Sequence, residues 1–142
     1  MTNLSLRLPL LTLALALAAG SSAAFAEEFY FKSPSGNIHC GYFDNDGNAL
    51  VRCDIESYTP SRKRPADCDL DWGFAFEIGA RAKRGIILCA GDTVISPQAE
   101  VLPYGTRWKR YGITCSIEET GVTCTNRRAR GFLLSRAEQR VF

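Results

Sequence analysis

The sequence predicts an all-β fold: a small, disulfide-stabilised antiparallel sandwich or barrel-like domain that is built from hairpins. Three observations favour this class. Short runs in which apolar and polar residues alternate are separated by turns rich in glycine and proline. No segment of the predicted domain shows the repeat of an amphipathic helix. Four of the six cysteines form two pairs that oppose each other across predicted hairpins, at a separation that suits disulfides.

Residues 1–26 carry the pattern of a secretory signal peptide. Arg7 is their only charged residue, a mostly apolar run follows it, and Ala24-Phe25-Ala26 fits a cleavage site. The apolar run is too short to cross a bilayer, and no later segment is long enough, so we expect no transmembrane segment. Cleavage after Ala26 would leave residues 27–142 as a single disulfide-stabilised β domain, either periplasmic or secreted.

The first hairpin is predicted by the pattern of residues 38–55. An aromatic strand, Phe29-Tyr30-Phe31, precedes it, followed by a turn with the sequence Ser-Pro-Ser-Gly-Asn. The centre of the hairpin, Asn45-Asp46-Gly47-Asn48, is a strong turn signal. Pairing the strands across this turn places Cys40 opposite Cys53, so we expect a disulfide between them.

The middle of the chain predicts a loop and then further strands. Residues 57–65 contain two prolines and three cations, which argue against a regular element. Residues 72–78 alternate large apolar residues with small or polar ones, which indicates a strand with an apolar face. Residues 86–90 indicate a buried strand that returns beside it, and a short strand is expected around Val101.

The second hairpin spans residues 113–126, with Glu118-Glu119-Thr120-Gly121 as its loop. Its register opposes Cys115 and Cys124 on an apolar face, while small polar residues occupy the other face. Residues 132–135 are predicted to form a strand that returns to this hairpin. Residues 136–142 are interpreted as a last helical turn or a frayed end.

The cysteines are expected to form three disulfides, as an exported domain with a small core requires. The two hairpin registers set two of these bonds, and elimination sets the third. The expected pairs are Cys40–Cys53, Cys68–Cys89 and Cys115–Cys124. Since no free thiol is expected and the chain has one histidine, we expect neither a metal site nor a cofactor.

Several segments, in order along nearly the whole domain, resemble a bacterial family of small exported six-cysteine proteins known only as a domain of unknown function. They include Ser33-Pro34-Ser35-Gly36-Asn37-Ile38 before Cys40, Gly91-Asp92-Thr93 after Cys89, Leu102-Pro103-Tyr104-Gly105, and Gly131-Phe132-x-Leu134-Ser135-Arg136. The family pattern has a Gly-His step before this last segment, where the present chain has Ala129-Arg130. The resemblance implies export and a six-cysteine domain, but no activity and no catalytic residues.

The charge of the domain is nearly balanced, because without Arg7 it has 16 Lys and Arg against 15 Asp and Glu. The cations nevertheless cluster in predicted loops and at strand ends: Arg62, Lys63 and Arg64; Arg81, Lys83 and Arg84; Arg107, Lys109 and Arg110; Arg127, Arg128 and Arg130. Clusters that converge would form an anion-binding surface, whereas scattered clusters would be ordinary solvated surface. Export and the lack of a recognition motif argue against nucleic acid.

Two sets of residues have the chemistry of a catalytic or metal site. Asp67, Asp69 and Asp71 would share one face of an extended segment, where they could hold calcium or serve hydrolysis; the simpler interpretation is a solvated approach to a strand. His39 lies opposite Asp54 in the predicted register and could form an oriented general base. No motif places a nucleophile beside it, so a partly exposed polar pair is the simpler interpretation.

These patterns favour binding over catalysis. The sequence contains no nucleotide-binding, metalloprotease or serine-hydrolase motif. We therefore expect a non-enzymatic extracytoplasmic module that binds an anionic envelope component or another protein through loops on a β scaffold. The alternative is a small secreted inhibitor of a hydrolase, which would present the loop of residues 57–65. A hydrolase that uses the three aspartates ranks third.

Overall fold

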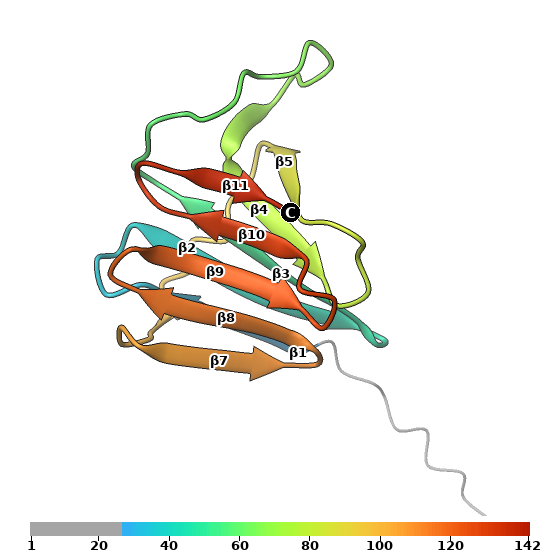
Figure 1. Ribbon diagram of the computed structural model, residues 1–142, viewed down its shortest axis with the longest axis vertical. Helices are drawn as coiled ribbons and strands as arrows, with labels where there is room; N and C mark the ends of the chain where they lie inside the picture. The colour runs from blue at the N-terminus through green and yellow to red at the C-terminus, as the bar shows by residue number, and fades with distance from the viewer. Residues whose placement is uncertain (1–26) are drawn as a thin grey trace, which may run out of the picture.

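A computed structural model describes residues 27–142, so the predicted signal peptide lies outside the described part of the chain. These residues form eleven β-strands and no helix (Figure 1), which confirms the all-β prediction. Accordingly, residues 27–142 offer no helical segment that would be long and apolar enough to span a membrane.

The strands form two sheets. The first sheet has the order β5-β4-β3-β2-β1-β6. Its strands are β1 (Glu27–Lys32), β2 (Ile38–Asn45), β3 (Asn48–Ile55), β4 (Asp71–Gly79), β5 (Ile86–Ala90) and β6 (Glu100–Val101). The second sheet has the order β11-β10-β9-β8-β7. Its strands are β7 (Thr106–Arg110), β8 (Ile113–Glu118), β9 (Gly121–Asn126), β10 (Gly131–Leu134) and β11 (Gln139–Val141). Neighbouring strands are antiparallel, except that β6 pairs with β1 in parallel.

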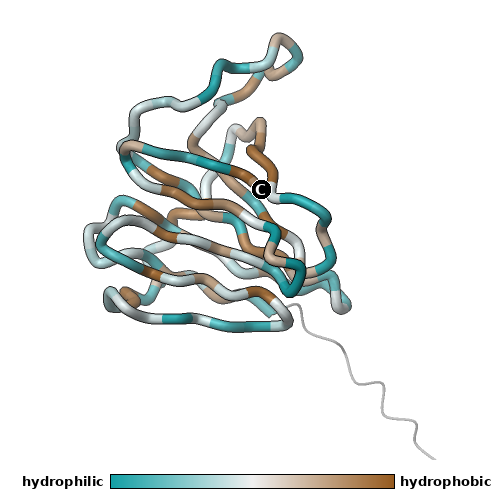
Figure 2. Tube along the Cα trace, in the orientation of Figure 1, coloured by the Kyte–Doolittle hydropathy of each residue, from teal (hydrophilic) through white to brown (hydrophobic). Residues whose placement is uncertain are grey.

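The two sheets lie face to face as a sandwich (Figure 1). Apolar side chains from alternate positions of both sheets meet between them, including Phe31, Val51 and Phe76 from the first sheet and Ile117 and Phe132 from the second. Figure 2 shows apolar stretches on the strands of both sheets and hydrophilic residues in many connecting loops. This alternation is what two packed sheets require, because each strand has one buried face.

Two disulfides meet at the centre of the core. Cys40–Cys53 joins β2 to β3 and Cys115–Cys124 joins β8 to β9, each in the predicted register. The sulfur of Cys53 lies 3.9 Å from that of Cys124, so the two bonds contact each other across the sandwich. The third disulfide joins Cys68, which precedes β4, to Cys89 of β5. All three predicted pairs are therefore confirmed.

An aromatic cluster closes the side of the sandwich where β1 faces β7. The ring of Trp108, on β7, stacks on Phe29 with centroids 5.9 Å apart and lies 5.3 Å from Phe31 and 5.4 Å from Tyr42. Strand β7 was not predicted, because its polar and charged residues around one tryptophan give no apolar alternation.

Two predictions about the strands were wrong. Residues 136–142 form neither a helical turn nor a frayed end: they contain β11, which pairs with β10. The terminal carbonyl oxygen of Phe142 accepts hydrogen bonds from the amides of Gly85 and Gly131, and these bonds order the segment. Residues 86–90 form a strand, but it is an edge strand whose Ile86 is 47% exposed, because no other strand in the described structure covers its outer side.

Tyr42 gives a prediction for stability and its pH dependence. Its side chain is fully buried, and its hydroxyl lies near the carboxylate of Asp44 but forms no hydrogen bond of good geometry with any group in residues 27–142. Burial raises its pKa to about 12, and the negative charge of Asp44 adds to the effect. Above the ordinary pKa of 10.0, Tyr42 loses its hydroxyl proton more readily in the unfolded chain than in the folded domain. The free energy of unfolding is therefore undiminished below that pH and falls as the pH rises towards 12.

Tyr42→Phe is therefore expected to stabilise the domain by about 1–2 kcal/mol near neutral pH, since it removes an unpaired buried hydroxyl. It should also reduce the loss of stability between neutral pH and about pH 11. Urea unfolding of both proteins at the two pH values measures both effects. A destabilised Tyr42→Phe variant near neutral pH would mean that the hydroxyl has a partner.

Candidate functional site

Turns that carry cations gather at one end of the sandwich, on the right of Figure 1. This is the end at which β2, β4, β7 and β9 finish. We call the cations of three of these turns the basic end: Arg81, Lys83 and Arg84 between β4 and β5; Lys109 and Arg110 at the end of β7; and Arg127, Arg128 and Arg130 between β9 and β10.

Asn126 joins two of these turns. Its side-chain nitrogen donates to the carbonyl oxygens of Gly79 at 3.1 Å and Ala82 at 2.8 Å, in the turn after β4. Its side-chain oxygen accepts from the amides of Arg128 at 3.0 Å and Arg130 at 3.2 Å, in its own turn. Since Asn126 is only 5% exposed, this link is part of the folded core and fixes the two turns side by side.

A close approach of two backbones reinforces this link. A side chain at position 85 would collide with the carbonyl oxygen of Gly131, so glycine is required there. The amides of both glycines donate to the carbonyl oxygen of Phe142, at 3.1 Å and 2.8 Å. The strands that flank the two basic turns are thus held at backbone contact distance.

The turn between β7 and β8 completes the basic end. The side chain of Arg127 lies over Gly112, where a Cβ atom would be 3.1 Å from its Nε. Two adjoining hollows result, of about 340 Å³ and 280 Å³, and both are lined by Tyr111, Gly112 and Arg127. Lys109 and Arg110 line the first hollow, and Arg81 lines the second. The ring of Tyr111 is 62% exposed beside them.

Most of the positive charge at this end is unpaired within residues 27–142. Arg110 forms an ion pair with Glu27, and the other seven cations have no ion pair among these residues. The acidic residue that lines a hollow is Asp44. Guanidinium groups in this arrangement are suited to bind carboxylate, sulfate or phosphate oxygens.

The structure does not bring all the predicted cations together. The loop that carries Arg62, Lys63 and Arg64 is held beside the β10–β11 turn, at the other end of the sandwich. There the amide of Thr59 donates to the carbonyl oxygen of Arg136 at 2.8 Å. Arg107 lies further along β7, opposite Ser116. Of the four predicted clusters, two lie wholly at the basic end. The cluster of Arg107, Lys109 and Arg110 contributes two of its three cations, and the cluster of Arg62, Lys63 and Arg64 lies apart.

The predicted carboxylate site does not form. Asp67, Asp69 and Asp71 are all exposed. Residues 27–142 contain no group of three His, Cys, Asp or Glu side chains that is close enough to hold a metal ion. Asp71 lines a hollow that is described below, but Asp67 and Asp69 do not, so the three aspartates do not converge on one pocket.

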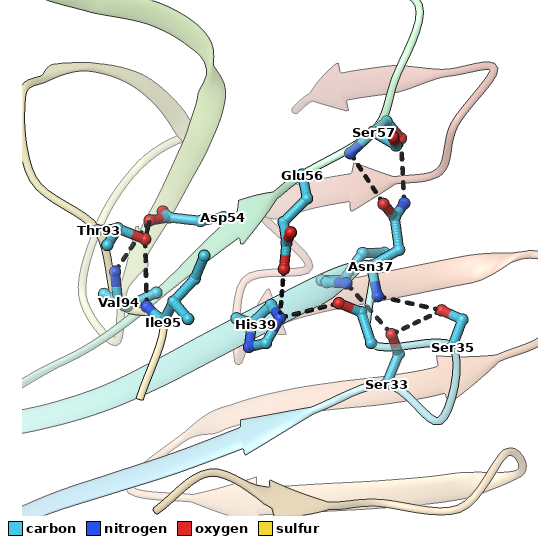
Figure 3. A network of polar contacts seen from close by, with 12 residues as sticks. Ser33, Ser35, Asn37, His39, Asp54, Glu56, Ser57, Thr93, Val94 and Ile95 are labelled. Atoms are coloured by element: carbon cyan, nitrogen blue, oxygen red, sulfur yellow. Dashed lines mark hydrogen bonds and ion pairs between the residues drawn. The ribbon is translucent and has the colours of Figure 1, made fainter. Parts of the chain in front are cut away.

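His39 and Asp54 lie opposite each other as predicted, but the expected partly exposed pair was wrong. Both side chains are buried, at 6% and 1% exposure, and each has other partners (Figure 3). His39 Nε2 lies 2.8 Å from the carbonyl oxygen of Gly36 and 2.8 Å from Glu56 Oε1. Both side chains are buried because residues 91–99, which we call the strap, cover this face of the sheet.

The strap runs from the β5 edge of the first sheet to the β1 edge, where β6 pairs. Asp54 holds it: its Oδ2 accepts from Thr93 Oγ1 and from the amide of Val94, both at 2.9 Å (Figure 3). Asp54 Oδ1 accepts from Arg52 Nε at 2.9 Å, and Arg52 Nη1 donates to Asp92 Oδ1 at 2.8 Å. The hydrogen bond from Arg52 and the positive charge of its guanidinium lower the pKa of Asp92.

Sequence reasoning missed Asn126, Tyr111 and the Arg52–Asp54 pair. The Asn-Arg-Arg turn after β9 was an available signal, because asparagine often bonds to backbone groups in turns. Arg52 and Asp54 occupy alternate positions of a strand, which normally indicates a solvated face.

The fold and these contacts define a disulfide-bonded β-sandwich domain with three basic turns at one end. The chain belongs to the group described as "Family of unknown function (DUF6636)", which matches residues 9–142. The chain matches no curated protein and no solved structure. This membership, with six cysteines in three disulfides, confirms the part of the resemblance that concerned a six-cysteine domain of unknown function.

Proposed function

We propose that this domain is a non-enzymatic extracytoplasmic binding module that holds an anionic envelope component at its basic end. The observation that carries the proposal is the convergence of three cationic turns, two of which are joined by the buried side chain of Asn126. Such turns present charge from a rigid scaffold, as binding loops do. Three disulfides suit a domain that works in an oxidising compartment.

The chemistry of the basic end suits a polymer or surface with repeated negative groups. One exposed ion pair contributes only about 0–1 kcal/mol, so useful affinity needs several at once. The basic end offers seven cations without an ion pair in residues 27–142. The exposed ring of Tyr111 adds an apolar surface for a sugar or acyl group.

Reversal of two charges at the basic end tests the proposal. Arg81→Glu with Arg127→Glu is expected to weaken co-sedimentation with washed bacterial envelopes by about tenfold or more at low salt. Binding by the unchanged protein should itself fall at high salt, because exposed charges are screened. The matched control is Arg62→Glu with Lys63→Glu, which changes the net charge equally at the distant loop and should retain most of the binding.

Equal losses in the two variants would show that net charge alone matters, and would contradict a site at the basic end. An unchanged protein that fails to bind envelopes at either salt concentration would remove the envelope component as the partner. Thermal unfolding of each variant checks that a loss of binding does not reflect a loss of fold.

A hydrolase inhibitor is the second candidate, and a specific observation favours it. The loop of residues 57–65 is largely exposed, yet Ser61 Oγ donates to the carbonyl oxygen of Gln139 at 3.0 Å and anchors it. An anchored loop loses less conformational entropy on binding than a free loop does, which favours tight inhibition. The control variant separates the two candidates, because Arg62→Glu with Lys63→Glu would alter inhibition but retain envelope binding.

A further inference from the structure

A second hollow lies at the end of the sandwich opposite to the basic end, where β3 finishes and β4 begins. Its volume is about 500 Å³. Part of its wall comes from the strap, through Ile95. The residues that give it chemical character are Glu56, Tyr58, Asp71, Trp72 and Phe74. None of the basic clusters lines it, so its chemistry is distinct from that of the basic end.

Three aromatic side chains form the apolar part of this wall. Tyr58, Trp72 and Phe74 are each half-buried, so each leaves part of its ring accessible. The hydroxyl of Tyr58 donates to the carbonyl oxygen of Trp72 at 3.3 Å, and its ring lies over Gly73, whose φ of +91° requires glycine. The indole N–H of Trp72 is buried. What Tyr58 and Trp72 offer to the hollow is therefore chiefly ring carbon.

The polar part of the wall is negative. Glu56 and Asp71 line the hollow, and no lysine or arginine does. The carboxylate of Glu56, whose side chain is 52% exposed, lies 2.8 Å from Nε2 of His39. Burial raises the pKa of Tyr58, and the negative charge of Asp71 raises it further. The carboxylate of Asp71 is thus close enough to the aromatic wall to interact with it electrostatically.

We propose that this hollow binds an organic cation, with a quaternary or alkylated ammonium group held between the aromatic rings and the two carboxylates. The face of an aromatic ring attracts a cation through its quadrupole, and nearby carboxylates add a direct attraction. An alkylated ammonium group is also weakly hydrated and fills an apolar wall. A neutral sugar can also stack on these rings and donate hydrogen bonds from its hydroxyls to the carboxylates. Only a cation gains the direct attraction of opposite charges, so the two carboxylates favour the cation.

Choline is the probe, and its neutral isostere 3,3-dimethylbutan-1-ol is the control ligand, because the two have the same shape and differ in charge. The indole N–H signals of Trp72 and Trp108, assigned with Trp72→Phe, report binding by NMR. Choline should shift the Trp72 signal in a saturable way, with a dissociation constant on the order of 1 mM. The signal of Trp108, which does not line the hollow, should stay in place. The isostere should bind at least about tenfold more weakly.

Matched variants locate the charge that matters. Asp71→Asn and Glu56→Gln should each weaken choline binding by about threefold or more. Asp69→Asn removes the same charge from an exposed neighbour that does not line the hollow, and should leave binding unchanged. The basic-end variant Arg81→Glu with Arg127→Glu should also bind choline normally, so this test is independent of the proposed envelope site.

Three outcomes would overturn the proposal. The first is no saturable shift with either choline or tetramethylammonium at concentrations on the order of 100 mM. The second is equal binding of choline and its isostere, which would reduce the hollow to an apolar patch. The third is tighter binding of a neutral sugar such as glucose than of choline, which would make it a carbohydrate site.

Discussion

Asp54→Ala is expected to destabilise the domain by about 3–5 kcal/mol, because it breaks a buried ion pair from one side. Asp54 is 1% exposed, and its carboxylate accepts bonds from Arg52, Thr93 and Val94. Without it the guanidinium of Arg52, which is 8% exposed, keeps only its bonds to Asp92. A buried charge that loses its main partner costs more than the pair itself contributes.

A graded series separates charge from hydrogen bonding at this site. Asp54→Asn keeps an oxygen that can accept from Thr93 or Val94 but removes the charge, so its cost should be intermediate. Asp92→Asn should cost no more than about 1 kcal/mol, since the Asp92 side chain is 80% exposed and its ion pair is screened by water. The expected order of stability loss is Asp54→Ala, then Asp54→Asn, then Asp92→Asn.

Urea unfolding near neutral pH measures this order, and hydrogen exchange adds a local test. The amide of Val94 donates to Asp54, so in Asp54→Ala it should exchange faster than the loss of global stability explains. Equal costs for Asp54→Ala and Asp92→Asn would contradict the role of Asp54 as the anchor of the strap.

The hairpin registers could be predicted from the sequence because their evidence is local. Ile38, Cys40 and Tyr42 face Ile55, Cys53 and Val51 across one turn. A shift of one residue would move one set to the other face of the sheet, so the apolar pattern allows a single register. Cys115 and Cys124 are fixed by the same reasoning.

The strap could not be predicted, because it depends on how distant segments cross. Arg52 and Asp54 alternate with buried Val51 and Cys53, a pattern that indicates a solvated outer face. Only the passage of residues 91–99 over that face buries them, and no local pattern encodes the crossing. Strand β11 was missed for a related reason: its Gln139 is buried through bonds to backbone groups rather than through apolar contact.

The candidate site was predictable in its residues but not in its geometry. Each basic cluster is visible as a run of cations in the sequence. Whether the clusters meet depends on which strand ends the stacked sheets bring together, and on Asn126, whose bonds to Gly79 and Ala82 span more than forty residues of sequence. The cluster at Arg62 was no less conspicuous, yet its loop is held at the opposite end of the fold.

Removal of the core disulfide Cys115–Cys124 is expected to cost about 3–5 kcal/mol, and removal of the edge disulfide Cys68–Cys89 about 2–3 kcal/mol. The chain entropy of loop closure predicts the reverse order, because the sequence separations are 9 and 21 residues. That entropic difference is less than about 1 kcal/mol, since it grows only with the logarithm of loop length. Burial therefore decides the order.

The burial of the two bonds differs clearly. Cys115 and Cys124 are both 0% exposed, and the sulfur of Cys124 contacts that of Cys53 at 3.9 Å. Alanine at both positions would leave a cavity at the centre of the sandwich, where the surrounding strands cannot collapse. The edge disulfide is buried at one end only: Cys68 is 5% exposed, whereas Cys89 is exposed on the edge strand β5. Alanine at these two positions therefore leaves a smaller buried cavity than alanine at Cys115 and Cys124.

Two double variants test this order: Cys115→Ala with Cys124→Ala, and Cys68→Ala with Cys89→Ala. Thiol titration and mass spectrometry first verify that the other two disulfides are intact, and urea unfolding then gives the two stabilities. A larger cost for the edge disulfide would mean that loop closure in the unfolded chain outweighs packing. The expected result, a larger cost for the core disulfide, would mean that the facing disulfides act mainly as buried apolar volume between the sheets.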